Sequence, residues 1–136
     1  MRTARRVLAA GGLLMVLTSN ALAHHSAIAF DFRKWATVEG IVKKFDVINP
    51  HAEIVLTVTD ANGTRDVAFE GHSRNNFYRA GWRPDSVKIG DKISITYAVR
   101  KDGTDGGFVN SFITADGKNV GFQLPGATAP ASTDGK

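Results

Sequence analysis

Three histidines of this chain have side chains and positions that would let them bind one metal ion together. His24 and His25 follow residues 21–23, Ala-Leu-Ala, which form the small-residue motif of a signal-peptide cleavage site. A cut after residue 23 makes His24 the first residue, and its α-amine, which titrates near neutral pH, could then chelate a metal together with its imidazole. His51 could supply another imidazole. A nitrogen-rich ligand set of this kind suits Cu(II) or Ni(II), and Zn(II) could use the same ligands tetrahedrally.

Copper is the first choice of metal, and zinc and nickel come after it. The chain has no cysteine, and both methionines, Met1 and Met15, precede the cleavage site. The processed chain therefore lacks the soft sulfur ligands of a Cu(I) chaperone. The alternative is that His24 and His25 are the polar start of a frayed arm and that His51 hydrogen-bonds its own turn.

A fourth histidine, His72, is a weaker candidate for a ligand. It follows the third expected strand, and in the barrel described below that junction tends to lie at the end opposite His51, so a capping or surface role is expected. Glu70 points outward from the same strand. It could form an ion pair with Arg79 or Arg83, and structural ion pairs outnumber catalytic acids.

No motif in the sequence supports catalysis by the protein's own side chains. There is no cysteine nucleophile, no nucleophile elbow, and no glycine-rich phosphate loop between a strand and a helix. The glycines of residues 103–107 join two expected strands and so form a hairpin turn. We therefore expect no catalytic residues and no organic cofactor, and any chemistry would come from a bound metal with open coordination positions.

Residues 1–23 have the three parts of a secretory signal peptide. Arginines near the start form the positive region, residues 7–17 form the apolar region, and residues 21–23 form the cleavage site. The apolar run is too short to span a membrane, and no other long apolar stretch follows it. We therefore expect a periplasmic or secreted protein that has no stable membrane span after processing.

Removing the signal peptide changes the charge of the protein. The whole chain has 17 basic and 13 acidic residues, a net charge of +4, but three of the arginines belong to residues 1–23. The processed part keeps 14 basic residues against 13 acidic ones, which is not the strongly basic footprint of a nucleic-acid-binding protein. The outward side chains of residues 53–60 and 64–70 include no aromatic stacking platform, so no nucleic-acid partner is expected.

Alternating apolar residues predict one strand on each side of His51. The first strand is residues 37–48, and the second is residues 52–60. The Asn-Pro-His sequence of residues 49–51 lies between them. Since Pro50 cannot donate a hydrogen bond to a sheet ladder, it belongs to the connection. His51 is therefore expected on a loop held by a rigid sheet.

Three further strands and one short helix are expected after this hairpin. A third strand covers residues 64–70, a helix is capped by Ser73 and ended by Gly81, and two strands cover residues 93–99 and 108–115. Three strands, a helix and two strands is the order of an OB-fold barrel. The predicted fold class is all-β with one short helix, a five-stranded OB-like barrel whose end is plugged by aromatic residues. A five-stranded barrel of another topology stays open, because alternation does not set the order of strands in space.

These elements divide the chain into four parts. Residues 1–23 are the signal peptide, residues 24–36 an N-terminal arm, residues 37–123 the OB-like barrel and residues 124–136 a disordered tail. The tail has the small and polar composition of segments that do not fold alone. Part of the arm, where apolar residues alternate, could pair as an edge strand.

Several motifs, in their order along the chain, resemble those of a known family, the small exported bacterial proteins grouped as domain-of-unknown-function family 6152. The matching residues are Ala23-His24-His25-Ser26, Phe45 with Asn49-Pro50-His51, Glu70 with Ser73, Arg79-Ala80-Gly81-Trp82, Gly90-Asp91, Asp102-Gly103 with Gly106-Gly107, and Ala115-Asp116-Gly117. The resemblance covers nearly the whole processed chain. It implies an exported β-barrel and brings no established activity with it.

Two functions from different classes fit these observations. The first is a periplasmic metal-binding accessory protein, copper first, whose ligands are His24, His25 and His51. The second is a non-catalytic envelope module that binds a protein partner or a small ligand and in which the histidines are incidental. The position of His51 relative to the start of the processed chain discriminates between the two.

Overall fold

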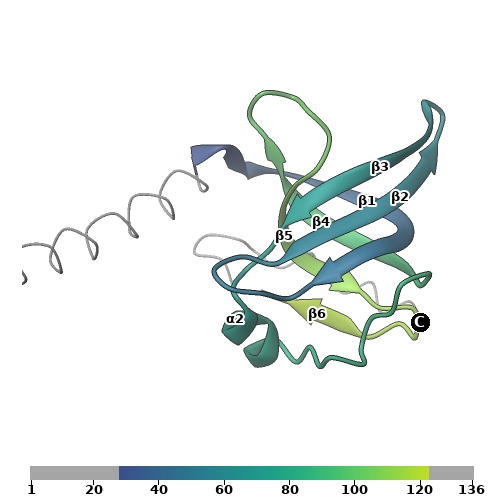
Figure 1. The fold of residues 1–136 in the computed structure, drawn as a ribbon. Helices are drawn as coiled ribbons and strands as arrows, with labels where there is room; N and C mark the ends of the chain where they lie inside the picture. The colour runs from purple at the N-terminus through teal and green to yellow at the C-terminus, as the bar shows by residue number, and fades with distance from the viewer. Residues whose placement is uncertain (1–27, 123–136) are drawn as a thin grey trace, which may run out of the picture.

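The computed structural model describes residues 28–122 of the chain (Figure 1). The elements are β1 (Phe30–Asp46), β2 (Glu53–Asp60), β3 (Gly63–Glu70), α2 (Arg74–Arg79), β4 (Lys92–Arg100), β5 (Gly107–Ile113) and β6 (Asn119–Gly121). The predicted order of three strands, a helix and two strands is confirmed, and β6 is a short additional strand. The expected signal peptide, His24, His25 and the expected C-terminal tail lie outside the described residues.

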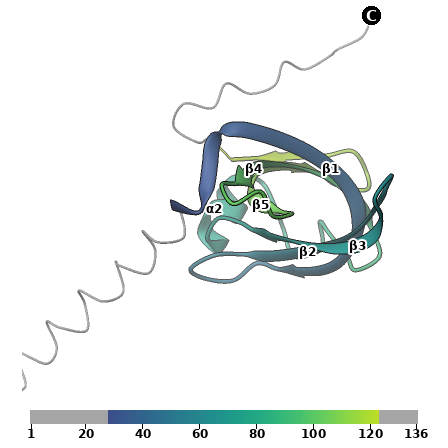
Figure 2. The same cartoon turned by 90° about the horizontal axis from the view of Figure 1, so that it is seen from above.

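The strands pair into a closed ring, which Figure 2 shows from above. β1 pairs antiparallel with β2 on one side and with β4 on the other, and β2–β3 and β4–β5 are also antiparallel pairs. The ring closes where β3 and β5 run parallel, with Phe69 opposite Gly107 and Glu70 opposite Phe108. A five-stranded ring with a helix between its third and fourth strands is the OB-like architecture, so the predicted fold class is confirmed.

β1 curves around the barrel because its pairing is interrupted twice. Its register with β2 shifts between Val42 and Lys44, and its register with β4 shifts between Asp31 and Trp35. A bulge breaks the alternation of side chains and lets the strand bend. Val42 and Phe45 can therefore both pack into the same core although they are three positions apart. This is why the alternation near Lys44 has no clear phase in the sequence.

β1 begins earlier than the first strand expected from the sequence. Phe30 pairs with Arg100, and Trp35 pairs with Ala98, both on β4. The later part of the segment expected as an N-terminal arm therefore belongs to the sheet. The expectation that part of this segment pairs as a strand is confirmed, and the pairing attaches the start of β1 to the barrel.

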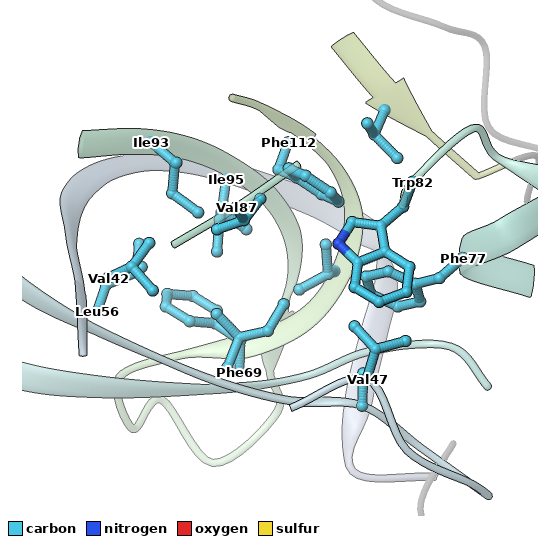
Figure 3. Close-up of a cluster of buried hydrophobic side chains, with 14 of the residues drawn as sticks. Val42, Val47, Leu56, Phe69, Phe77, Trp82, Val87, Ile93, Ile95 and Phe112 are labelled. Atoms are coloured by element: carbon cyan, nitrogen blue, oxygen red, sulfur yellow. The ribbon is translucent and has the colours of Figure 1, made fainter. Parts of the chain in front are cut away.

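The inside of the barrel is filled by apolar side chains from the strands of the ring and from the helical region (Figure 3). On β2, the alternate residues Ile54, Leu56 and Val58 are almost completely buried, as their spacing predicts. Phe77 of α2 and Trp82 just after it are also buried, and their ring centroids lie 5.9 Å apart. The predicted aromatic plug is therefore confirmed.

α2 is a short helix whose start differs from the expected cap. Ser73 occupies the N-cap position, but its side chain makes no capping hydrogen bond. Its backbone carbonyl instead accepts hydrogen bonds from the N–H groups of Asn76 and Phe77, at 3.0 and 3.2 Å. Gly81 follows the helix end with a φ of 94°, as predicted. Between residues 28 and 122, no helix is long and apolar enough to cross a membrane.

Candidate functional site

The loop between β1 and β2 carries the Asn-Pro-His sequence at one end of the barrel. The side-chain oxygen of Asn49 accepts a hydrogen bond from the N–H of Arg74 at 3.1 Å, which connects this loop to the start of α2. Pro50 and His51 lie in the connection and not in a strand, as predicted. The loop is therefore held both by the sheet and by the helix.

His72 lies beside this loop, at the same end of the barrel. Beyond the last ladder pair of β2 and β3, the N–H of Gly71 donates to the Ala52 carbonyl at 2.8 Å. The N–H of Ala52 in turn donates to the His72 carbonyl at 3.1 Å. The prediction that His72 lies at the end opposite His51 is wrong, because an antiparallel pair brings together the residues before β2 and the residues after β3.

Glu70, the last residue of β3, contacts the same loop. Its carboxylate contacts the Nδ1 atom of His51. The prediction that Glu70 pairs with Arg79 or Arg83 is therefore wrong. The pairing of β2 with β3 places Glu70 next to the loop, whereas the Arg83 guanidinium donates to the backbone carbonyl of Tyr78 at 3.0 Å.

The carboxylate of Glu70 sets the orientation of the His51 imidazole. The carboxylate contacts Nδ1, so a metal would have to bind the other ring nitrogen of His51, Nε2. Proteins commonly orient metal-binding histidines through a carboxylate on the second ring nitrogen. The arrangement is therefore chemically compatible with the expected role of His51 as a ligand.

The ring of Phe108 on β5 contacts side chains from three separate parts of the chain. The imidazoles of His51 and His72 meet it edge-on, with centroid distances of 6.0 and 4.9 Å and interplanar angles of 87° and 86°. The rings of Phe30 and Phe32 lie 5.5 and 5.7 Å from the same ring. The start of β1 therefore lies at the same end of the barrel as both histidines.

His72 is half-buried, and its surroundings differ from those of His51. Its Nε2 atom is buried and has no hydrogen-bond partner among the described residues. Its ring packs against Phe122, with a centroid distance of 4.6 Å. Burial, together with the nearby His51, lowers the pKa of His72 below its usual value of 6.5. The imidazole of His72 is therefore neutral at neutral pH.

The lowered pKa of His72 predicts that the protein loses stability in mild acid. Below about pH 6.5 the unfolded chain protonates this histidine more readily than the folded chain, so the free energy of unfolding falls until the pH passes the folded-state pKa. Denaturant titrations between about pH 7.5 and pH 5 should show this fall, and the variant His72→Gln should show less of it. An equal fall in the variant would contradict the role of His72. Carboxyl groups whose pKa is lowered in the folded protein, such as Asp66, change the free energy of unfolding only when the pH falls toward and below their usual pKa of 3.8. Their effect therefore lies outside the pH range of these titrations.

The described histidines do not form a metal site by themselves. Across residues 28–122, no group of three or more His, Cys, Asp or Glu side chains is arranged to hold a metal ion. His51 and Glu70 are in contact, and His72 shares the Phe108 ring with His51. A metal site built on His51 would therefore need ligands from beyond the described residues.

Sequence reasoning misplaces His72, although the turn of the hairpin contains the information. Asp60 faces Gly63 across the tight turn between β2 and β3. Counting nine residues outward from this pair reaches His51 on one side and His72 on the other. Because a tight turn sets the register of a hairpin, its Asp-Ala-Asn-Gly sequence was the usable signal. Phe108 comes from β5, and no local pattern places it at the histidines.

Comparison with known proteins identifies the family of this chain. Residues 12–110, more than half of the chain, match the model of a family of unknown function, DUF6152. The matched region includes all four histidines and Glu70. No curated protein and no solved structure was found to match the chain. The chain therefore belongs to the family of unknown function DUF6152, as the resemblance of its sequence motifs implies.

Proposed function

We propose that this protein is exported and that, after removal of residues 1–23, it binds one copper ion through His24, His25 and His51. It acts in the periplasm or outside the cell as a metal-binding accessory protein. The terminal amine and imidazole of His24, with the imidazoles of the other two residues, offer the nitrogen ligands that Cu(II) favours. No catalytic step is part of this proposal.

The shared contact with Phe108 is the observation that carries the proposal. Phe30 lies 5.5 Å and His51 lies 6.0 Å from Phe108, measured between ring centroids, so the Phe30 and His51 rings are separated by no more than the sum of these distances. His25 precedes Phe30 by five residues. The chain ahead of Phe30 therefore starts from the end of the barrel that carries His51.

The contact between His51 and Glu70 supports the same function. A carboxylate on one ring nitrogen fixes the orientation of a metal-binding histidine and raises its basicity as a ligand. Both side chains keep contact with solvent, with 28% of His51 and 27% of Glu70 exposed. An ion in solution can therefore approach the His51 ring without unfolding the barrel.

A titration with Cu(II) tests the proposal. The full chain is expressed in a host that exports it, recovered after processing, and checked by mass spectrometry for a start at His24. We expect one equivalent of Cu(II) to bind. Because a ligand is lost, His51→Ala should weaken binding by more than about 100-fold, and Glu70→Gln should weaken it by roughly 10–100-fold, the range for residues that orient a ligand.

Two further variants separate the metal site from a general disturbance of the loop. His72→Gln is the matched control, because His72 also contacts Phe108 but is not a proposed ligand, so copper affinity should not change. One residue added before His24 moves the α-amine away from that imidazole and should weaken binding as strongly as His51→Ala. If copper affinity survives both His51→Ala and the residue added before His24, the site assignment is wrong, and an envelope interaction module becomes the better interpretation.

A further inference from the structure

A cavity of about 440 Å³ lies between α2 and β6, near the histidines but lined by a different set of side chains. Its lining residues are His72, Asn76, Arg79, Ala80, Gly121 and Phe122. Figure 1 shows α2 and β6 next to each other at this end of the barrel. The volume lies within the range of pockets that hold small organic ligands.

The charge of the cavity lining is positive. Arg79 carries a positively charged guanidinium, and none of the described residues that line the cavity has a carboxylate. Within residues 28–122, Arg79 forms no ion pair, because the carboxylate of Glu70 contacts His51 instead. An exposed guanidinium at the rim of a cavity can bind a carboxylate through two parallel hydrogen bonds.

The opposite wall of the cavity is apolar and firmly packed. The ring of Phe122 is buried and lies 4.8 Å from the ring of Phe77 and 4.6 Å from that of His72, measured between centroids. Ala80 adds a methyl group to the lining. A ligand that fits this cavity therefore has an apolar body beside its charged group.

Two neutral polar side chains complete the lining. Asn76 lies on the same helix as Arg79 and offers both a donor and an acceptor through its amide. The Nε2 atom of His72 has no hydrogen-bond partner among the described residues, although it is buried. Polar and apolar surface therefore contribute about equally to the lining.

We propose that this cavity binds a small organic monocarboxylate, whose carboxylate is held by Arg79 and Asn76 and whose apolar body packs against Phe122 and Ala80. A single guanidinium suits one carboxylate better than a multiply charged phosphate. The proposal goes beyond copper binding, because His51, the proposed copper ligand among the described residues, does not line the cavity. It therefore stands or fails independently of the metal site.

The test uses benzoate as the probe and the ¹⁵N-labelled, processed, metal-free protein. Benzoate should produce saturable shifts in the NMR signals of backbone amides that line the cavity, those of Asn76, Ala80, Gly121 and Phe122. Benzamide has the same shape without the charge and should bind at least about 10-fold more weakly, because hydrogen bonds to charged groups are the stronger ones. Inorganic phosphate lacks the apolar body and should also bind more weakly than benzoate.

Two arginine variants on the same helix make the test specific. Arg79→Gln should weaken benzoate binding by roughly 10–100-fold, as expected for the loss of hydrogen bonds to a charged group. Arg74→Gln is the matched control: it removes the same charge from α2, but Arg74 does not line the cavity, so benzoate affinity should not change.

Several outcomes would overturn the proposal. They are the absence of saturable shifts with benzoate, equal binding of benzamide, tighter binding of phosphate, and an equal loss of affinity in both arginine variants. If Arg79→Gln instead shifts the signals of residues 123–136, which follow Phe122, the chain's own C-terminal segment occupies the cavity, and the ligand assignment is wrong. All measurements are made without metal, so a failure here leaves the copper result unaffected.

Discussion

Replacing Phe77 with alanine is expected to lower the free energy of unfolding by about 3–5 kcal/mol, the range for loss of a fully buried aromatic side chain. Phe77 is 0% exposed. Its ring packs among those of Phe45, Trp82 and Phe112, with centroid distances of 6.2, 5.9 and 6.1 Å. Truncation would leave a cavity between aromatic rings from different elements, which cannot all move to fill it.

Urea denaturation of the wild type and the variant measures this loss, with an unchanged slope showing that both unfold in the same way. The matched control is Ile89→Ala, because Ile89 is 67% exposed and its truncation should change stability by no more than about 0.5 kcal/mol. A loss below about 1 kcal/mol for Phe77→Ala would contradict the packing described above. The variant should also disturb the cavity beside α2, since Phe77 supports the ring of Phe122 at 4.8 Å.

Replacing Gly106 with alanine is expected to lower the free energy of unfolding by about 2–5 kcal/mol, the combined cost of a left-handed backbone and of overpacking. Gly106 has a φ of +89°, a conformation that L residues rarely adopt. A Cβ atom there would also lie 2.0 Å from the backbone oxygen of Ala68. This oxygen cannot move away without disturbing the backbone of β3. The substitution therefore acts where β3 and β5 close the ring.

Gly103→Ala is the matched control, because Gly103 lies in the same loop with a φ of +76° but has open space around it. Gly103→Ala should lower the free energy of unfolding only by the cost of placing an alanine in a left-handed backbone conformation, about 1–2 kcal/mol. Equal losses for the two variants, measured by thermal or urea unfolding, would show that the contact with Ala68 is unimportant. Phe108 lies near the start of β5, two residues after Gly106. Gly106→Ala should therefore also weaken the contacts of His51 and His72 with the Phe108 ring.

The strands of the ring could largely be predicted from the sequence, because their evidence is local. Ile54, Leu56 and Val58 alternate along β2 and are buried together, as a period of two requires. The same reasoning is weaker for β1. Val42 and Phe45 share the core only because a bulge opposite β2 shifts the register, and a bulge depends on the partner strand as much as on β1 itself.

The candidate site could be predicted only in part. Pro50 excludes a strand, so the placement of His51 on a loop follows from the sequence and agrees with the structure. The neighbours of His51 follow only from the register of the β2–β3 hairpin, which was not used in the prediction. Glu70 contacts His51 instead of an arginine, and His72 lies beside His51 instead of at the far end, because the hairpin register decides which residues meet.

By itself, the sequence determined the spacing of the strands, the loop position of His51 and the family to which the chain belongs. Only the tertiary structure decided that Phe108 meets both His51 and His72 and connects them to the start of β1. The physical reason is that periodicity and turn chemistry act over a few neighbouring residues. The contacts around Phe108 instead depend on closure of the ring between β3 and β5, two strands that are joined through a helix and another strand.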